Sequence, residues 1–169
     1  MVGEGNLVTF DRGPGWVTNP VETRRIHAYW TKKGEPGYAK IGWGTRGDFT
    51  RAKGKEVMEA FLKAEGKKIN VLYAHNDDMA IGAIQAIEEA GLKPAKDILV
   101  ISVDGVKGAF EAMIAGKLNV SVECSPLLGP LVMATAKDIA AGKTVARRII
   151  GKDGVYPMET AAKEFPSRQ

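Results

Sequence analysis

Five side chains whose types suit the binding of a polyhydroxylated molecule stand at four separate points of the sequence. They are Phe49, Asn76, Asp104, Glu123 and Cys124. An amide group both donates and accepts hydrogen bonds, and an ionised carboxylate can accept from two hydroxyl groups. An aromatic ring can lie on the apolar C–H face of a sugar, and ligand pockets combine a few placed polar groups with an apolar wall. These residue types therefore indicate non-covalent sugar binding, provided that the fold brings them together.

From residue 48 onward, helical and strand patterns alternate along the chain. Amphipathic periodicity and capping residues predict helices at 51–65, between residues 77 and 91, at 106–115 and at 126–141. Short apolar runs predict buried strands at 69–74, 98–103 and 118–123, with a weaker strand at 145–150. Continuous apolar strands that alternate with helices are typical of an α/β fold, in which helices flank a parallel sheet on both faces.

This fold class would place the candidate side chains along one edge of the sheet. In an open parallel sheet, ligands bind beyond the carboxyl ends of the strands. Asn76 follows the strand at 69–74, and Asp104 follows the strand at 98–103. Glu123 and Cys124 lie at the end of the next strand, and a strand before helix 51–65 would end close to Phe49. We therefore expect these residues to share one site.

Each assignment has a structural alternative. Asp77, Asp78 and Asp104 each precede a predicted helix, and all three could be ordinary N-cap residues. Phe49 could belong to the hydrophobic core. Cys124 is more typical of a small buried hydrophobic residue than of a nucleophile.

Two other patterns indicate chemistry less specifically. Residues 42–47 match G-x-G-x-x-G, but no clear strand precedes the motif and no helix opens within it, as a dinucleotide site requires. The acidic residues Asp77, Asp78, Asp104 and Glu123 could hold Mg²⁺ in a phosphate-transferring enzyme. No phosphate-binding lysine or nucleophile accompanies them, and we expect neither a metal nor a cofactor.

The first 44 residues differ from the rest of the chain. They contain all three tryptophans and eight of the 20 glycines, and they show no sustained period. We expect loop or poorly ordered chain there, apart from a short strand at 7–10 and a weak helix at 23–31. The sequence therefore divides into an atypical Gly/Trp-rich segment at 1–44 and an α/β lobe at 45–169.

Composition and charge exclude several classes of protein. A chain of 169 residues with 44% hydrophobic and 26% charged residues is neither disordered nor a small disulfide scaffold, and its single cysteine cannot form an internal disulfide. The net charge of +4 comes from the N-terminal part, where no basic face on an ordered element indicates nucleic-acid binding. No signal peptide or membrane-spanning stretch is visible, so the chain as written is expected to be cytoplasmic.

Four motifs resemble the carboxyl-terminal lobe of periplasmic sugar-binding proteins of ABC importers, of the ribose/galactose type. They are GDFTRAKG at 47–54, AHNDDMAIGA at 74–83, SVDG at 102–105 and VECSPLLGP at 122–130. Their order and spacing are jointly specific, and the second and fourth are most similar to the galactofuranose-binding branch. The resemblance runs from about residue 45 to residue 169.

The resemblance implies one lobe of a type I periplasmic binding protein fold, which closes on a sugar and presents it to a membrane permease. By the same resemblance, Phe49 stacks on the sugar, Asn76 and Asp104 bind its hydroxyl groups, and Arg51 and Glu123 or Cys124 contribute. A full receptor of this kind is periplasmic and has two lobes, so we expect this chain to be a truncated half-site. Its newly exposed surfaces would favour self-association. The alternatives are the effector domain of a LacI-type regulator or a truncated product without present activity.

Overall fold

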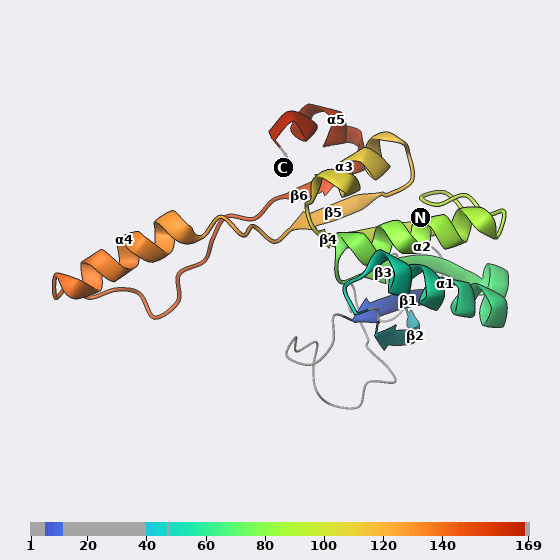
Figure 1. Ribbon diagram of the computed structural model, residues 1–169, viewed down its shortest axis with the longest axis horizontal. Helices are drawn as coiled ribbons and strands as arrows, with labels where there is room; N and C mark the ends of the chain where they lie inside the picture. The colour runs from blue at the N-terminus through green and yellow to red at the C-terminus, as the bar shows by residue number, and fades with distance from the viewer. Residues whose placement is uncertain (1–5, 12–39, 47, 168–169) are drawn as a thin grey trace.

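The computed structural model describes residues 6–11, 40–46 and 48–167, which form a twisted sheet with helices packed along it (Figure 1). The strands are β1 (Asn6–Asp11), β2 (Lys40–Arg46), β3 (Ile69–Ala74), β4 (Leu99–Asp104), β5 (Val120–Glu123) and β6 (Val155–Pro157). The α-helices are α1 (Arg51–Glu65), α2 (Asp77–Glu89), α3 (Lys107–Ile114), α4 (Gly129–Ala140) and α5 (Ala161–Glu164). Short 3₁₀ turns occupy Gly66–Lys68, Met158–Thr160 and Phe165–Ser167.

The sheet has six strands in the order β2-β1-β3-β4-β5-β6. Strands β1 to β5 pair in parallel, which confirms the α/β fold with a parallel sheet. Strand β6 pairs antiparallel with β5 and forms the far edge. The prediction of a strand at 145–150 is wrong: that segment has no regular structure, and the edge is filled by the later residues 155–157.

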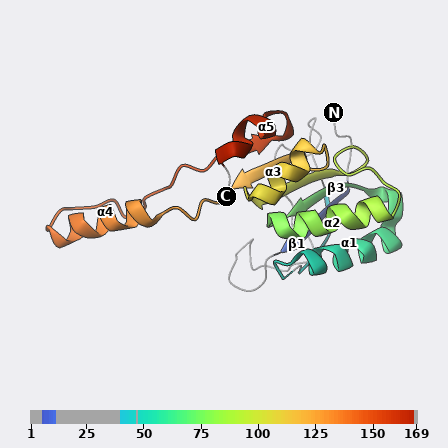
Figure 2. The ribbon, with the colours of Figure 1, turned by 45° about the horizontal axis from the view of Figure 1, so that its top comes forward.

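The two faces of the sheet are covered unequally by the described residues. Helices α1, α2 and α3 lie side by side on one face (Figure 2). The main core fills the space between them and the sheet, with Met58, Leu72, Met79, Ile87 and Phe110 all fully buried. The other face carries a small cluster around Val71. The expectation that helices flank both faces is therefore confirmed for one face only within the described part of the chain.

The helices begin and end at the residue types that the sequence indicates. Thr50 caps α1, because its side chain accepts a hydrogen bond from the Lys53 amide at 3.2 Å. Gly91 follows α2 with φ of +75°, a left-handed conformation that suits a residue without Cβ. The predicted boundaries of α1 to α3 are thereby confirmed to within one or two residues.

The N-terminal part contributes more to the sheet than the sequence predicts. The short strand expected at 7–10 lies within β1, but β2 was not recognised, since its sequence KIGWGTR is rich in glycine. The expectation of loop, which covered residues 1–44, is therefore wrong for residues 40–44. The weak helix expected at 23–31 lies outside the described residues.

Helix α4 projects away from the body of the molecule (Figure 1). Both views show it at the end of two connecting segments, 124–128 and 141–154, that have no regular strand or helix. None of its residues is buried. Large apolar side chains such as Val132, Met133 and Ile139 are more than half exposed, at 59%, 60% and 58%.

Among the described helices, none combines the length and the apolar character needed to cross a membrane.

Candidate functional site

The carboxyl ends of β2, β3, β4 and β5 meet at one edge of the sheet, because these strands run in the same direction. Strand β2 takes the place of the strand that the sequence analysis considered before α1, and its end leads to Phe49. Loops at this edge are connected by hydrogen bonds that the described residues form with one another. The edge is therefore a single structural unit, as the sequence predicts.

The first connection joins Phe49 to Asn76. The Asn76 side chain donates from Nδ2 to the Phe49 carbonyl oxygen at 3.2 Å, and its Oδ1 accepts from the Met79 amide at 2.9 Å. Asn76 is therefore the N-cap of α2, a role that the sequence assigned to Asp77 or Asp78. Its amide is 7% exposed and keeps one further N–H. Phe49 is 46% exposed, so the alternative that it belongs to the core is wrong.

Two glycines bring the first turns of α1 and α2 into close backbone contact. A Cβ added to Gly54 would lie 2.7 Å from the Met79 Cα atom, and one added to Gly82 would lie 2.9 Å from the Lys55 nitrogen. Only glycine permits this approach, which places the loop before α1 beside the loop before α2. The Arg51 Nε atom donates to Asp78 Oδ1 at 2.7 Å across the same contact. Both side chains are substantially exposed, so this ion pair orients Arg51 more than it stabilises the fold.

Asp104 ends β4 in a strained backbone conformation. Its φ is +127°, a region that residues with a Cβ rarely adopt. Its carbonyl oxygen accepts a hydrogen bond from the Cys124 amide at 3.1 Å, which joins the ends of β4 and β5. The N-cap of α3 is Val106, without a side-chain hydrogen bond, so Asp104 is not the cap that the alternative proposed.

The strained residues coincide with the predicted site. Four non-glycine residues of the described chain have positive φ, and three of them, Asp48, Phe49 and Asp104, lie at this edge. Backbone strain of this kind costs on the order of 1–3 kcal/mol per residue and tends to occur at binding sites. The geometry therefore marks the same edge as the residue types do.

Glu123 and Cys124 follow each other but have different surroundings. The Glu123 Oε2 atom accepts from the Gly154 amide at 3.0 Å and from the Tyr156 hydroxyl at 2.8 Å. Glu123 thereby holds the segment that leads into β6. Cys124 is exposed and forms no disulfide, so the alternative of a buried hydrophobic residue is wrong.

The sequence names Asp77 only as a possible helix cap or Mg²⁺ ligand, whereas the structure buries it fully behind the edge. Its carboxylate accepts hydrogen bonds from Ser102, Ser121, Gly105 and Val106. Burial raises the pKa of Asp77 above its ordinary value, and the hydrogen bonds from Ser102, Val106 and Ser121 partly oppose this change, while the nearby Asp104 charge adds to it. The signal in the sequence was the pair Ser102 and Ser121, which lie opposite each other in two otherwise apolar strands.

Within the described residues, no group of three His, Cys, Asp or Glu side chains is arranged to hold a metal ion. Three of the acidic residues considered for Mg²⁺ form hydrogen bonds or ion pairs with protein groups. Asp77 is enclosed by hydrogen-bond donors, and Asp78 pairs with Arg51. Glu123 accepts hydrogen bonds from Gly154 and Tyr156. Residues 42–46 of the G-x-G-x-x-G match lie inside β2, where no helix begins.

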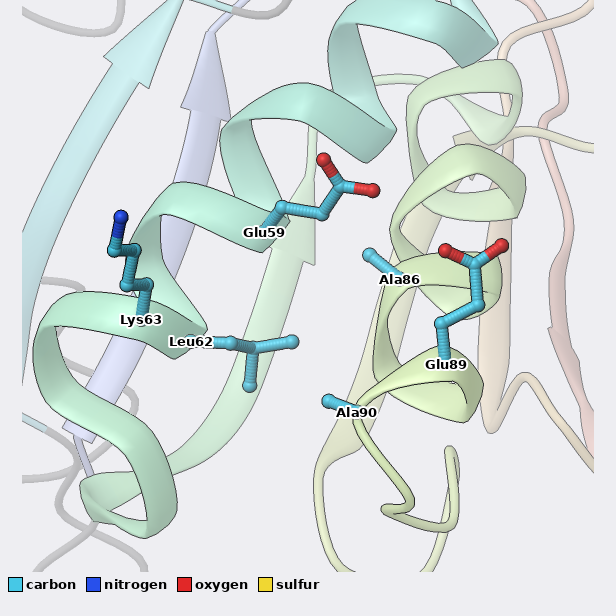
Figure 3. A pocket seen from close by; sticks show the side chains of 6 residues that line it. All are labelled: Glu59, Leu62, Lys63, Ala86, Glu89 and Ala90. Carbon is cyan, nitrogen blue, oxygen red and sulfur yellow. The ribbon is translucent and has the colours of Figure 1, made fainter.

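A separate hollow of about 340 Å³ lies between α1 and α2 (Figure 3). It is lined by Glu59, Leu62, Lys63, Ala86, Glu89 and Ala90. These residues lie in the C-terminal halves of the two helices or, for Ala90, at the C-cap of α2, whereas the predicted site lies at the N-terminal ends of the helices. The hollow is therefore not part of the sheet edge.

Comparison with known proteins identifies a family model and individual proteins that are similar to this chain. A family model described as a periplasmic binding protein domain matches residues 1–144. The galactofuranose-binding protein YtfQ of Escherichia coli (strain K12) is 52% identical over 126 residues, which are 73% of this chain and 40% of that protein. The ribose import binding protein RbsB of Bacillus subtilis (strain 168) is 44% identical over 103 residues, 60% of this chain and 32% of that protein.

A solved structure extends the likeness to the fold. The periplasmic binding protein component of the arabinose ABC transporter from Shewanella sp. ANA-3, bound to α- and β-L-arabinofuranose, superposes with a TM-score of 0.75 at 36% identity. The match covers 98% of this chain and 55% of that one, so the chain spans about half the length of its relatives or less. The family match includes residues 1–44, whereas the motifs place the resemblance only from about residue 45 onward. The chain belongs to the periplasmic binding protein family.

Proposed function

We propose that this chain is a ligand-contacting lobe of the substrate-binding component of an ABC-type sugar importer, and that it binds a monosaccharide non-covalently without catalysis. The observation that carries the proposal is the edge where β2 to β5 end, at which strained residues and sugar-binding residue types coincide. The relatives named for sugar import support it. The proposed lobe comprises residues 45–169, and strands β1 and β2 extend its sheet.

The proposed substrate is a pentose or hexose in its furanose form. The similar Escherichia coli protein is named for galactofuranose, and the similar Shewanella protein is bound to arabinofuranose in its solved structure. A five-membered ring presents an apolar C–H face and several hydroxyl groups, which suits one aromatic ring beside an amide and a carboxylate.

The candidate residues receive distinct proposed roles. The exposed ring of Phe49 packs against the sugar, the remaining N–H of Asn76 donates to a hydroxyl group, and the Asp104 carboxylate accepts from hydroxyl groups. Arg51 reaches the site from the first turn of α1, and Cys124 lies beside Asp104. Glu123 acts mainly by holding the segment before β6, since its Oε2 atom already accepts two hydrogen bonds.

The site that this chain supplies is one half of a closed pocket. A receptor that closes two lobes buries its ligand on both faces, and much of its affinity comes from that burial. A single lobe leaves one face of the sugar in water. We therefore expect weak binding, with a dissociation constant on the order of 1 mM, until a second lobe or chain completes the site.

Further parts of the proposal concern location and partners. A full receptor of this family would act in the periplasm and deliver its sugar to a membrane permease. The isolated chain is expected to self-associate through the exposed apolar side chains of α4. Light scattering at increasing concentration tests this point, and a constant monomer mass would contradict it.

Calorimetric titration with L-arabinose, D-galactose and D-ribose tests the sugar site. Asp104→Asn removes a charged acceptor, and Asn76→Asp keeps an N-cap for α2 but loses the amide donor. Each is expected to weaken binding by about tenfold, because a hydrogen-bonding partner of the sugar is lost. Glu111→Gln, on the exposed face of α3, is the control and should bind like the parent chain. Equal binding by Asp104→Asn and the parent chain would contradict the proposal.

A further inference from the structure

Asp77 occupies a position where an acidic residue is normally exposed. It is the first residue of α2, yet its side chain has no solvent exposure. Its Oδ2 atom accepts from the Gly105 amide at 2.7 Å and from the Val106 amide at 2.8 Å. Its Oδ1 atom accepts from the hydroxyl groups of Ser102 and Ser121. A buried carboxylate is costly without partners, and four donors enclose this one.

The four donors come from three other parts of the fold. Ser102 lies in β4 and Ser121 in β5, and the two residues pair directly across the strands. Gly105 and Val106 form the turn between β4 and α3. The Ser121 hydroxyl also accepts from the Gly105 amide at 3.2 Å, so the turn is held from two sides. One carboxylate therefore ties the start of α2 to β4, to β5 and to the turn that follows β4.

This arrangement fixes the peptide group that follows Asp104. The Asp104 carbonyl oxygen accepts from the Cys124 amide at 3.1 Å, and the Gly105 amide of the same peptide donates to Asp77. Both ends of the peptide are thus bonded to different elements. Such fixing is needed because Asp104 has φ of +127°, and a strained backbone persists only where its surroundings determine it.

We propose that Asp77 is a positioning residue, which holds the Asp104–Gly105 peptide in its strained conformation and so sets the place of the Asp104 carboxylate at the sheet edge. Its importance for ligand binding rests on the proposed function. Asp77 itself does not contact a sugar, since its side chain is enclosed. The aspartate that follows the N-cap of α2 thereby acts on a loop 28 residues later in the chain.

Two variants separate the hydrogen-bonding role of Asp77 from its charge. Asp77→Ala removes both carboxylate oxygens, so the Val106 amide loses this acceptor and the Gly105 amide keeps only its longer hydrogen bond to the Ser121 hydroxyl. Asp77→Asn keeps one oxygen for these two amides, while its NH₂ group can donate to hydroxyl groups of Ser102 and Ser121 that rotate to accept. Asp78→Ala changes the neighbouring acid, which pairs with Arg51 and does not touch the turn.

Amide hydrogen exchange, measured without any sugar, reports how firmly the turn at Gly105 and Val106 is held by its hydrogen bonds. In the parent chain, the Gly105 and Val106 amides should be protected. In Asp77→Ala, both should exchange about tenfold faster or more, while Asp77→Asn and Asp78→Ala stay close to the parent. Unchanged protection in Asp77→Ala would overturn the inference. If that variant does not fold, fast exchange of both amides in the parent chain would overturn it equally.

Titration of the parent chain and the two Asp77 variants with L-arabinose measures the consequence for binding. Asp77→Ala should bind about tenfold more weakly than the parent, and Asp77→Asn should recover affinity to within about threefold. A loosened turn with full affinity would overturn the positioning role. Absence of binding by the parent chain would instead contradict the proposed function, and the exchange comparison would still decide whether Asp77 holds the turn.

Discussion

Helices α2 and α4 are similar in length and apolar content, yet one is embedded in the core and the other projects from the molecule. Helix α2 has 13 residues, seven of them Ala, Ile or Met, and eight of its residues are buried. Helix α4 has 12 residues, seven of them Ala, Leu, Val, Met or Ile, and none is buried. Apolar composition therefore predicts that a helix needs a partner surface, but not whether its own chain provides one.

The difference lies in what each helix can contact. Helix α2 lies against α1, α3 and the sheet, and Gly54 and Gly82 allow its backbone to approach that of α1. Helix α4 is connected by segments without regular structure, and its large apolar side chains remain exposed. A helix of this length is marginal in water by itself, so α4 depends on a partner surface for stability. The candidate site lies on the packed region, where the helix ends are fixed.

Truncation of one isoleucine in each helix gives the largest expected contrast. Ile87 of α2 is 0% exposed and Ile139 of α4 is 58% exposed. Ile87→Ala removes core contacts and leaves a cavity, and should lower the free energy of unfolding by about 2–5 kcal/mol. At protein concentrations where the chain is monomeric, Ile139→Ala should change it by no more than about 0.5 kcal/mol. Urea denaturation measures both, and a comparable loss for Ile139→Ala would mean that α4 is packed in solution.

Addition of a methyl group to one glycine in each helix gives the next contrast. A Cβ at Gly82 would meet the backbone of Arg51 and Lys55, whereas one at Gly129 has no atom within 4 Å. Gly82→Ala should destabilise the chain by about 1–3 kcal/mol, since α1 and α2 must move apart. Gly129→Ala should be neutral or stabilise by about 0.5 kcal/mol, because alanine favours the helix. Thermal unfolding of both variants checks this, and tolerance of Gly82→Ala would refute the close helix contact.

Neutralisation of one acidic residue in each helix gives the smallest expected difference in stability between α2 and α4. This difference depends on pH. Because burial raises the pKa of Asp77 in the folded state, the folded chain binds this proton more tightly than the unfolded chain. The stability contributed by Asp77 is then fully present below its unfolded pKa, near 4, and is lost as the pH rises through the folded pKa. Asp77→Asn does not titrate, so its stability relative to the parent should increase from pH 4 upward.

Urea denaturation of Asp77→Asn and the parent chain between pH 4 and pH 8 measures this difference. Asp138→Asn in α4 is the control, since Asp138 forms an exposed pair with Lys143. Its effect should stay within about 0.5 kcal/mol at every pH. A stability difference for Asp77→Asn that is flat or decreases with pH would show that the carboxylate is not held in a costly buried state.

Much of the fold could be predicted from local sequence patterns. Strands β3 and β4 are continuous apolar runs, and α1 and α2 carry clear caps and glycine stops, so each element is specified by its own residues. Strand β6 could not be predicted in this way, because it has three residues and depends on pairing with β5. The apolar residues at 145–150 indicated a strand, but no strand of the described sheet pairs with them.

The candidate site was predictable in position and less so in detail. The rule that ligands bind at the carboxyl ends of parallel strands selected the loops that the structure brings together. The exchange of roles between Asn76 and Asp77 was not predictable from spacing, since both can cap a helix. It follows from the serines of β4 and β5, which offer donors to the buried Asp77 and leave Asn76 as the cap. Such a choice depends on contacts between distant residues.

The most direct test of the sugar site is a chemical-shift map of the backbone amides during titration with L-arabinose. Shifts are expected at Phe49, Asn76, Gly105 and Cys124, and none in α4 or around the hollow lined by Glu59 and Glu89. The same titration of Asp104→Asn should show these shifts at several-fold higher sugar concentration. Shifts confined to α4 or to the hollow, or no shifts at any sugar concentration, would contradict the claim that this edge of the sheet binds a sugar.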